Sequence, residues 1–183
     1  MLYIMRHGKT DWNMKYKLQG RTDIPLNDDG RKMAADAAKE CADIHFDVCY
    51  CSPLVRARET AEIFLQGRDV PIIVDNRLIE MCFGEFEGTE RCYEIPNCPM
   101  TVFFKTPAEY KVPVAGGESM DELFARTGEF LREVAMPLVE QGKDVLIVGH
   151  GAMNSSIICQ VKNKERKDFW SDGIKNCKLM KLL

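Results

Sequence analysis

Short apolar runs alternate along this 183-residue chain with segments in which apolar residues recur at helical spacing. Two of these runs, at residues 1–6 and 144–149, are each followed directly by a His-Gly pair. Runs this short are typical of buried strands rather than helices. A glycine just after a strand lets the backbone turn sharply or approach a ligand closely. The pattern therefore predicts two strands that each deliver a histidine to a turn.

The same pattern predicts strands and helices in alternation over the whole chain. Strands are expected at residues 1–6, 47–51, 71–75 and 144–149, with a last one within 176–183. Helices are expected from Asn27 to Cys41, from Ser52 to Leu65, and at 118–140, 151–161 and 167–172. This alternation favours an α/β fold of three layers, α/β/α, with a mainly parallel central sheet. The length is that of a single domain, residues 1–183.

Two of the expected helices carry capping signals at their starts. Asn27 is a predicted N-cap, followed by Asp28 and Asp29 in a first turn where the helix dipole favours acids. Ser52 is the predicted N-cap of the next helix, with Pro53 at its first position. We therefore expect that helix to begin directly after the preceding strand.

Residues 90–117 break the alternation. This segment is rich in proline and aromatic residues and shows no clear period, so we expect a short lid insertion of irregular structure. Its rings either face a bound ligand or pack the lid onto the body of the domain; they belong to Tyr93, Phe103, Phe104 and Tyr110.

Composition and charge narrow the classes of function. The formal net charge is -3 and the sequence pI about 5.7, without a long basic run, which disfavours nucleic acid as the main partner. No apolar stretch approaches ~18 residues, so we expect no membrane span. The first residues lack the basic segment of a signal peptide, so we expect a cytoplasmic protein. The eight cysteines are then expected to stay reduced, and their spacing does not indicate a zinc site.

Charged and polar side chains gather at or near the predicted strand ends: Arg6, His7, Arg56, Glu80 and His150. In open α/β sheets, ligands bind beyond the carboxyl ends of the strands, so we expect these groups to meet there. The guanidinium fork of arginine matches the oxygens of a phosphate group. Backbone amides at the starts of the helices after the second and fourth strands are expected to add donors for the same anion.

The histidines and the carboxylate add reactive chemistry to this anion site. A neutral imidazole can attack phosphorus and form a covalent intermediate. A carboxylic acid nearby can protonate the leaving oxygen and later accept a proton from water. Together these residue types indicate phosphoryl transfer.

Five motifs, in this order along the chain, resemble those of the histidine phosphatase superfamily, also called the phosphoglycerate mutase-like family. They are Arg6-His7-Gly8-Lys9-Thr10-Asp11-Trp12-Asn13, Gln19-Gly20-Arg21-Thr22-Asp23, Ser52-Pro53-Leu54-Val55-Arg56-Ala57, Leu78-Ile79-Glu80 with Glu87-Gly88, and Gly149-His150-Gly151. One such motif alone is a weak signal, whereas five in the family's order are specific.

The resemblance implies a phosphoglycerate mutase-like fold and a role for each central residue. His7 is the implied nucleophile, which becomes phosphorylated. Arg6, Arg56 and His150 are implied to hold the phosphoryl oxygens. Glu80 is the implied proton donor and later the base, while Glu85 and Glu87 are interpreted as solvated turn residues.

Further residues are implied to contact the substrate or its phosphate: Asn13, Arg21 and Gly151. The implied substrate is a small phosphorylated metabolite, and the family needs neither a metal nor a cofactor. Lys9 departs from common family forms, and we hypothesise that it favours multiply charged substrates. The oligomeric state is not fixed by the sequence, and a homodimer is left open.

The resemblance also bears on the choice between hydrolysis and mutase-type transfer. Mutases of the family hold the substrate carboxylate with paired arginines in a larger insert and cover the site with a C-terminal tail. Residues 90–117 contain no Arg-Arg pair and the sequence ends at Leu183, so we expect a metal-independent phosphomonoesterase. Phosphoglycerate mutase-type transfer and a non-catalytic phospho-ligand-binding module are the alternatives.

Overall fold

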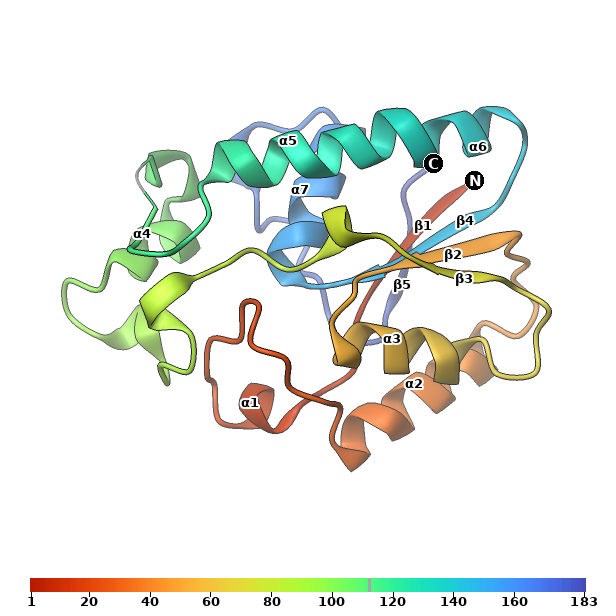
Figure 1. The fold of residues 1–183 in the computed structure, drawn as a ribbon, viewed down its shortest axis with the longest axis horizontal. Helices are drawn as coiled ribbons and strands as arrows, with labels where there is room; N and C mark the ends of the chain where they lie inside the picture. Colours follow the sequence, from red (N-terminus) through yellow and green to blue (C-terminus); the bar gives the residue numbers. More distant parts are fainter. Residues whose placement is uncertain (112) are drawn as a thin grey trace.

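The computed structural model describes residues 1–111 and 113–183, and its strands form one central sheet between two layers of helices (Figure 1). Within the described residues, five strands pair in the order β3-β2-β4-β1-β5. Their bounds are β1 Leu2–Arg6, β2 Val48–Cys51, β3 Ile72–Val74, β4 Val145–Gly149 and β5 Leu179–Lys181. The first four strands are parallel and β5 is antiparallel to β1. The predicted mainly parallel sheet is confirmed.

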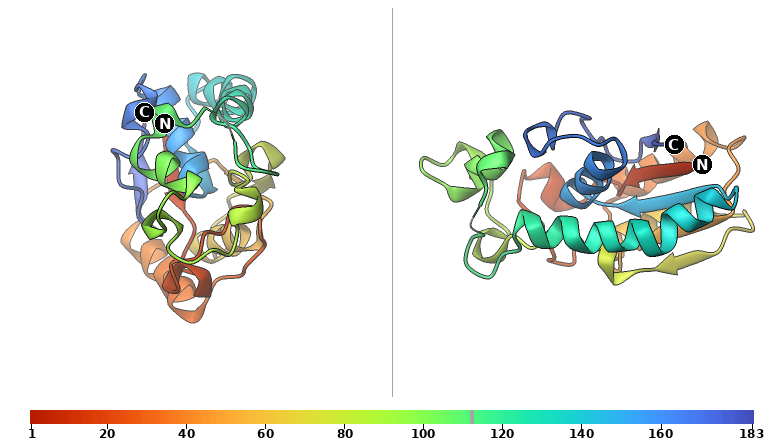
Figure 2. Two further views of the ribbon diagram at one scale, coloured as in Figure 1. Left: turned by 90° about the vertical axis from the view of Figure 1, so that its left-hand side faces the viewer. Right: turned by 90° about the horizontal axis from the view of Figure 1, so that it is seen from above.

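Helices cover both faces of the sheet (Figures 1 and 2). Helices α2 and α3 lie on one face, and α5 and α7 lie on the other. The helix bounds are α1 Asp11–Met14, α2 Asp28–Glu40, α3 Val55–Phe64, α4 Pro99–Lys105, α5 Met120–Phe130, α6 Met136–Glu140 and α7 Gly151–Val161. The three-layer α/β/α arrangement expected from the sequence is therefore confirmed.

Both faces of the inner strands are buried, which explains why their sequences are continuously apolar. Successive side chains of a strand point to opposite faces. Leu2 and Ile4 of β1 join the core beneath α5 and α7, whereas Tyr3 and Met5 join the core beneath α2 and α3. Each of these four side chains is at most 8% exposed.

The helix after β2 begins later than its capping signals predicted. Asn27 does cap α2, where its side chain accepts from Gly30 N. However, α3 starts at Val55, and its N-cap residue Leu54 makes no side-chain capping bond. The Val55 amide donates instead to Asp23 Oδ1 at 2.8 Å. A carboxylate from another loop therefore replaces Ser52 as the cap, because Ser52 is engaged elsewhere.

The long helix predicted at 118–140 is continuous but not uniform. Ser119 caps α5 in a reciprocal capping box with Glu122. The turn Leu131–Ala135 is a π-helical segment, and α6 follows it. Pro137 has no amide proton and its ring crowds the carbonyl four residues earlier, so the α-helical hydrogen-bond ladder is interrupted there.

The predicted irregular insertion at 90–117 is more ordered than expected. It contains α4 and short 3-10 turns at Cys92–Glu94 and Pro107–Glu109, and residue 112 lies outside the described residues. Phe103 and Tyr110 are buried, 0% and 5% exposed, and their rings lie 5.2 Å apart. These two aromatic side chains therefore pack the insertion onto the body of the protein.

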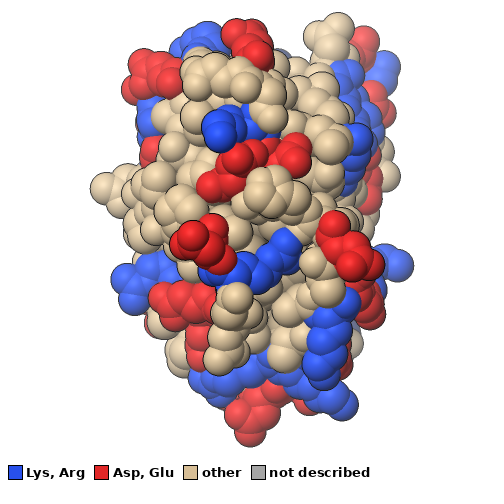
Figure 3. Space-filling model, turned by 90° about the vertical axis from the view of Figure 1, so that its right-hand side faces the viewer, with Lys and Arg blue, Asp and Glu red and all other residues tan. Residues whose placement is uncertain are grey.

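The surface carries charges of both signs. On the face shown in Figure 3, basic and acidic side chains are interspersed among neutral ones, so a broad field of one sign does not form there. This distribution fits a net charge of only -3. No helix in the described ranges combines the length and apolar character needed to cross a membrane.

Two glycines allow the loop after β1 to pack against the first turn of α2. A Cβ added at Gly8 would lie 2.6 Å from the Gly30 carbonyl oxygen, and one added at Gly30 would lie 2.7 Å from Lys9 N and closer still to Lys9 O. These are backbone atoms, which cannot move aside independently. The close approach fixes the loop that carries His7.

We predict that Gly30→Ala lowers the free energy of unfolding by about 1–3 kcal/mol through overpacking, although alanine is the better helix former. Gly151→Ala is the matched control, because a Cβ there meets its nearest neighbour at 3.7 Å, an ordinary contact. Urea unfolding followed by circular dichroism measures both variants. Equal stabilities would show that the Gly8–Gly30 contact does not constrain the fold.

Candidate active site

The two strand-end histidines meet at the carboxyl edge of the sheet. Strands β1 and β4 are parallel neighbours in which Arg6 pairs with Gly149, so His7 and His150 leave the sheet side by side. Their ring centroids lie 5.1 Å apart. His7 is 2% exposed and His150 is fully buried. The sequence prediction that the two imidazoles meet is confirmed by this geometry.

The surroundings of His7 fix its tautomer and its charge. Its Nδ1 lies 2.6 Å from the carbonyl oxygen of Gly8, which assigns the ring proton to Nδ1 and leaves the lone pair on Nε2. Burial, followed by the nearby charges of Arg56 and Arg6, lowers the pKa of His7 well below 6.5. The imidazole is therefore neutral at physiological pH. Asn176 donates to the His7 carbonyl oxygen at 2.6 Å and helps to fix the turn.

Two arginines bring buried positive charge to the same place. Arg56, on the first turn of α3, is 1% exposed and donates to the carbonyl oxygens of Gly20 and Thr22 at 2.6 and 2.9 Å. Burial lowers its pKa to about 10, so it stays charged at neutral pH. Arg6 donates to Ile174 O at 3.3 Å, and burial lowers its pKa as well. Among the described residues, Nε of each arginine is buried without a partner.

Glu80 lies against the start of α7 rather than in solution. Its Oε1 accepts from the Met81 and Met153 amides at 2.8 and 2.9 Å, and its Oε2 accepts from the Ala152 amide at 3.2 Å. The prediction that the amides at this helix start serve an external anion is therefore wrong. Glu80 occupies them, because a helix N-terminus attracts the carboxylate that lies nearest.

His150 is held from behind by Ser52. The distance from His150 Nε2 to Ser52 Oγ is 2.7 Å, and Ser52 Oγ also accepts from the Leu54 amide at 3.3 Å. Burial and the charge of Arg56 lower the pKa of His150 well below 6.5, so this ring is neutral too. Its Nδ1 is buried and has no partner within the described residues. We infer that the Ser52 hydroxyl donates its hydrogen bond to His150 Nε2. The ring proton of His150 then lies on Nδ1, which is free to donate.

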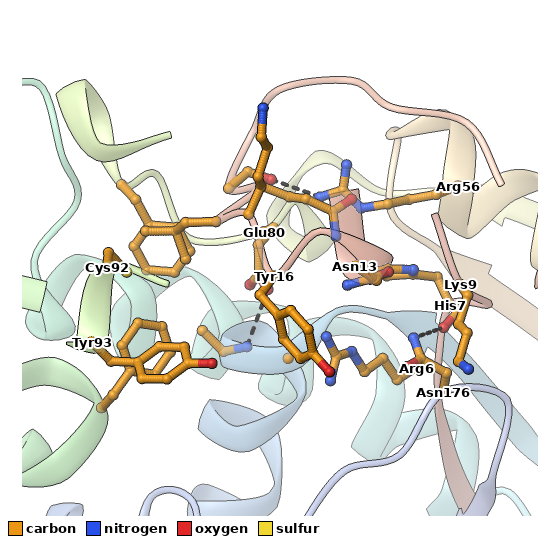
Figure 4. A pocket seen from close by; sticks show the side chains of 18 of the residues that line it. Arg6, His7, Lys9, Asn13, Tyr16, Arg56, Glu80, Cys92, Tyr93 and Asn176 are labelled. Atoms are coloured by element: carbon orange, nitrogen blue, oxygen red, sulfur yellow. Dashed lines mark hydrogen bonds between the residues drawn. The ribbon is translucent and has the colours of Figure 1, made fainter. Parts of the chain in front are cut away.

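A cavity of about 470 Å³ opens beside these groups (Figure 4). Side chains from the loop after β1, from the insertion and from the C-terminal region line it. They include Arg6, His7, Lys9, Asn13, Tyr16, Lys17, Arg56, Glu80, Phe83, Cys92, Tyr93, Phe104, Gly151, Trp170 and Asn176. Arg6, His7 and Arg56 thus share one cavity with a set of aromatic rings, whereas His150 is fully buried beside His7 and is not among the lining residues.

The three predicted substrate contacts lie in different positions. Asn13 lines the cavity, and its Oδ1 accepts from Thr10 in the capping box of α1. Gly151 also lines the cavity, between Glu80 and Arg6. Arg21 is outside the set of described lining residues, so it does not reach the same space as Asn13.

Arg21 supports Glu80 from outside the cavity. Its Nε donates to the Glu80 carbonyl oxygen at 3.1 Å, and its Nη2 lies 3.3 Å from Glu118 Oε1. Glu118 is buried and paired with Arg126, whose Nε donates to it at 2.6 Å. This placement supports a positioning role for Arg21.

Several residues of the site are not predicted by the sequence pattern. The pattern predicts Ser52 as a helix cap, although its position directly after a strand also indicates the sheet edge. Glu87 was interpreted as a solvated turn residue, which is wrong, because it accepts from the amides of Arg21, Thr22 and Phe83 and shapes the loop. No sequence pattern around Asn176 indicates a site residue, because only the fold brings the C-terminal region beside His7.

Within the parts of the chain that the structure describes, no group of three or more His, Cys, Asp or Glu side chains has the geometry to hold a metal ion. Positive charge in the cavity is supplied by side chains, among them Arg6, Lys9 and Arg56.

We predict that His7 and His150 are neutral at pH 6.5, where a free histidine is half protonated. A lowered pKa means that the proton leaves at lower pH, so both rings are neutral from pH 6.5 upward. Nitrogen-15 NMR of labelled imidazoles distinguishes charged rings from the two neutral tautomers. His7→Gln and His150→Gln assign the signals, and an imidazolium signal from either ring at pH 6.5 would contradict the prediction.

Comparison with known proteins agrees with this geometry. The family model described as "Histidine phosphatase superfamily (branch 1)" matches residues 2–183. Phosphoserine phosphatase 1 of Hydrogenobacter thermophilus is 30% identical over 96% of this chain and 82% of its own length. A 2,3-bisphosphoglycerate-dependent phosphoglycerate mutase of Gloeobacter violaceus is 29% identical over 88% of this chain and 75% of its length. Among solved structures, Bacillus stearothermophilus YhfR superposes with a TM-score of 0.86 at 30% identity, covering 97% of this chain and 88% of that one. The chain therefore belongs to the histidine phosphatase superfamily.

Proposed function

We propose that this protein is a phosphoric monoester hydrolase that transfers the phosphoryl group of a small metabolite to His7 and then to water. One observation carries the proposal: a neutral imidazole lies among buried cationic and neutral donors that lack partners within the described part of the chain. An unpaired buried donor is costly, and a phosphoryl group would satisfy several at once. The similarity to a named phosphoserine phosphatase supports the same chemistry.

In the first half-reaction, His7 Nε2 attacks phosphorus in line with the ester oxygen. A P–N bond forms as the P–O ester bond breaks, and the positive charge of the new phosphoimidazolium is shared through Nδ1–H with the Gly8 carbonyl. Arg6, Arg56 and His150 hold the three remaining oxygens, where charge-assisted hydrogen bonds are strongest. Protonated Glu80 gives its proton to the leaving alkoxide.

In the second half-reaction, water replaces the alcohol. The Glu80 carboxylate takes a proton from the water, whose oxygen attacks phosphorus as the P–N bond breaks. Inorganic phosphate leaves and His7 returns to the neutral form. Glu80 stays in one place while it loses and regains its proton. Arg21 holds its backbone carbonyl, and the amides of Ala152 and Met153 hold its carboxylate. The cycle uses charges supplied by the protein and needs no metal.

Mutase-type transfer is the second candidate, since several relatives are named as phosphoglycerate mutases. The cavity wall argues against it. From the insertion, the described residues that line the cavity are Cys92, Tyr93 and Phe104, which offer no cation for a substrate carboxylate. A binding module without catalysis is disfavoured by the neutral, oriented His7, because holding an anion needs no nucleophile.

We predict that His7→Ala loses phosphate release by at least about a thousandfold, as expected when a nucleophile is removed. The assay follows phosphate from p-nitrophenyl phosphate and from sugar, glycerate and nucleoside phosphates, with EDTA present. Substrate labelled with phosphorus-32 should mark the wild type with an acid-labile group and leave His7→Ala unlabelled. His45→Ala is the control, because His45 is exposed and distant from the sheet edge.

Three outcomes would contradict this proposal. Release that stops with EDTA would point to a metal-dependent reaction. Labelling that persists in His7→Ala would place the intermediate elsewhere. Isomer formation from phosphoglycerate, in place of phosphate release, would favour the mutase.

We predict that Ser52→Ala lowers kcat by about tenfold, which corresponds to the loss of one hydrogen bond worth ~1.5 kcal/mol in the transition state. Without the hydroxyl, His150 is free to adopt the other tautomer and its Nδ1 proton is lost. Ser156→Ala is the matched control, because Ser156 is a buried serine of α7 bonded to Thr127 at 2.7 Å, away from the cavity. If Ser52→Ala leaves kcat unchanged, and nitrogen-15 NMR shows the same His150 tautomer in the variant, Ser52 does not position His150.

A further inference from the structure

The cavity has two ends of different chemistry (Figure 4). At one end lie Arg6, His7, Arg56, Lys9 and Asn176, which we call the cationic end. On the opposite side of Glu80 the labelled side chains are Cys92 and Tyr93, whereas the Tyr16 ring lies beside Glu80 and points toward Arg6. Phe104 and Trp170 line the same cavity, and with Tyr93 they form what we call the aromatic end, which Tyr16 adjoins. A monoester whose phosphorus faces His7 would direct its alcohol portion toward this end.

The aromatic end is a preorganised wall. Phe104 and Trp170 are stacked, with ring centroids 5.7 Å apart and planes inclined by 22°. Trp170 Nε1 donates to the Phe103 carbonyl oxygen at 3.0 Å, which fixes the indole. The Tyr93 ring meets Phe104 edge-on at 6.1 Å. A flat group that enters the cavity would therefore find ring faces already oriented.

Tyr16 is held at the cavity in a strained backbone conformation. Its φ is +53°, in the left-handed region that a bulky residue rarely adopts. The strain is maintained by the insertion, because the Arg91 amide donates to Tyr16 O at 2.9 Å and the Arg91 guanidinium lies 4.4 Å from the ring centroid. The residue is nevertheless 55% exposed, so this arrangement does not serve burial. Strain that persists at a cavity is typical of a functional site.

Within the described residues no cation lies over the ring of Tyr93, Phe104 or Trp170, whereas Arg91 lies over the Tyr16 ring. Three of the cations that line the cavity, Arg6, Lys9 and Arg56, lie at the cationic end. Another, Lys17, has its ammonium 5.7 Å from the ring centroid of Trp12. The aromatic end therefore suits an uncharged planar group better than a carboxylate or a second phosphate.

We propose that the aromatic end binds the leaving group, and that the preferred substrates are phosphate monoesters of alcohols that carry a planar unsaturated ring. This inference rests on the proposed function and names its substrate class. The cavity volume of about 470 Å³ lies within the usual range of small-molecule sites. Stacking of one ring on aromatic side chains corresponds to a preference of about five- to 150-fold.

The test compares esters with matched leaving groups, because an acidic phenol would leave faster for chemical reasons alone. Adenosine 5′-monophosphate is compared with ribose 5-phosphate, which shares its primary alcohol. Benzyl phosphate is compared with cyclohexylmethyl phosphate, which has a ring of similar size that is not flat. In each pair we expect kcat/KM to favour the planar ester by at least about fivefold. If only the first pair shows a preference, the aromatic end recognises a nucleoside. If both pairs show one, it recognises any planar ring.

The variant Phe104→Leu tests whether the aromatic end, and not another part of the protein, causes the preference. We expect it to reduce the planar preference several-fold by removing the stacked face. Phe124→Leu is the matched control, because Phe124 is also half-buried and contacts the neighbouring Phe169 ring at 6.0 Å, outside the cavity lining. Tyr16→Leu should act like Phe104→Leu and not like the control.

Failure of this inference differs from failure of the proposed function. If all four esters release phosphate in a His7-dependent manner with ratios near one, the aromatic end does not select substrates and the hydrolase proposal stands. A preference that Phe104→Leu and Tyr16→Leu both leave unchanged would equally overturn the inference. If no ester releases phosphate and His7 is never labelled, the proposed function itself is overturned.

Discussion

Two guanidinium groups beside two neutral imidazoles impose the constraint on which the rest of this structure depends. Arg56 is almost completely buried, and its nitrogens donate to backbone carbonyl oxygens rather than to carboxylates. Carbonyl dipoles compensate a buried charge only in part. The uncompensated remainder favours an anion. Burial first, and this positive charge second, also keep His7 and His150 from taking protons.

Glu80 shows how the fold keeps a carboxylate near these cations without letting it neutralise them. The amides of Met81, Ala152 and Met153 hold its two oxygens against the start of α7. Arg21 and Glu118 fix its backbone from the other side. A carboxylate anchored in this way remains beside the phosphoryl position but does not swing onto the guanidinium groups. The amides of Ala152 and Met153 at the helix N-terminus therefore bind the Glu80 carboxylate.

The insertion at 90–117 combines packing with recognition. Phe103 is buried in the core, whereas its neighbour Phe104 faces the cavity beside Trp170. Consecutive residues of one short helix, α4, thus face different environments. Arg91 extends the same segment to Tyr16 and ties the loop after β1 to the insertion. The loop after β1 and the insertion that supplies Tyr93 and Phe104 are consequently connected.

The sequence by itself determined the alternation of strands and helices and the parallel sheet, because both follow from the local spacing of apolar residues. It also determined that His7 meets His150, because each histidine directly follows a strand. It did not determine where α3 begins, since a carboxylate 32 positions earlier, Asp23, caps that helix. It could not show that Glu80 occupies the start of α7, that Ser52 holds His150, or that Tyr16 and Trp170 share a cavity with Arg6. Those arrangements join residues far apart in the chain, and their partners are chosen by distance and burial, which exist only once the layers have packed.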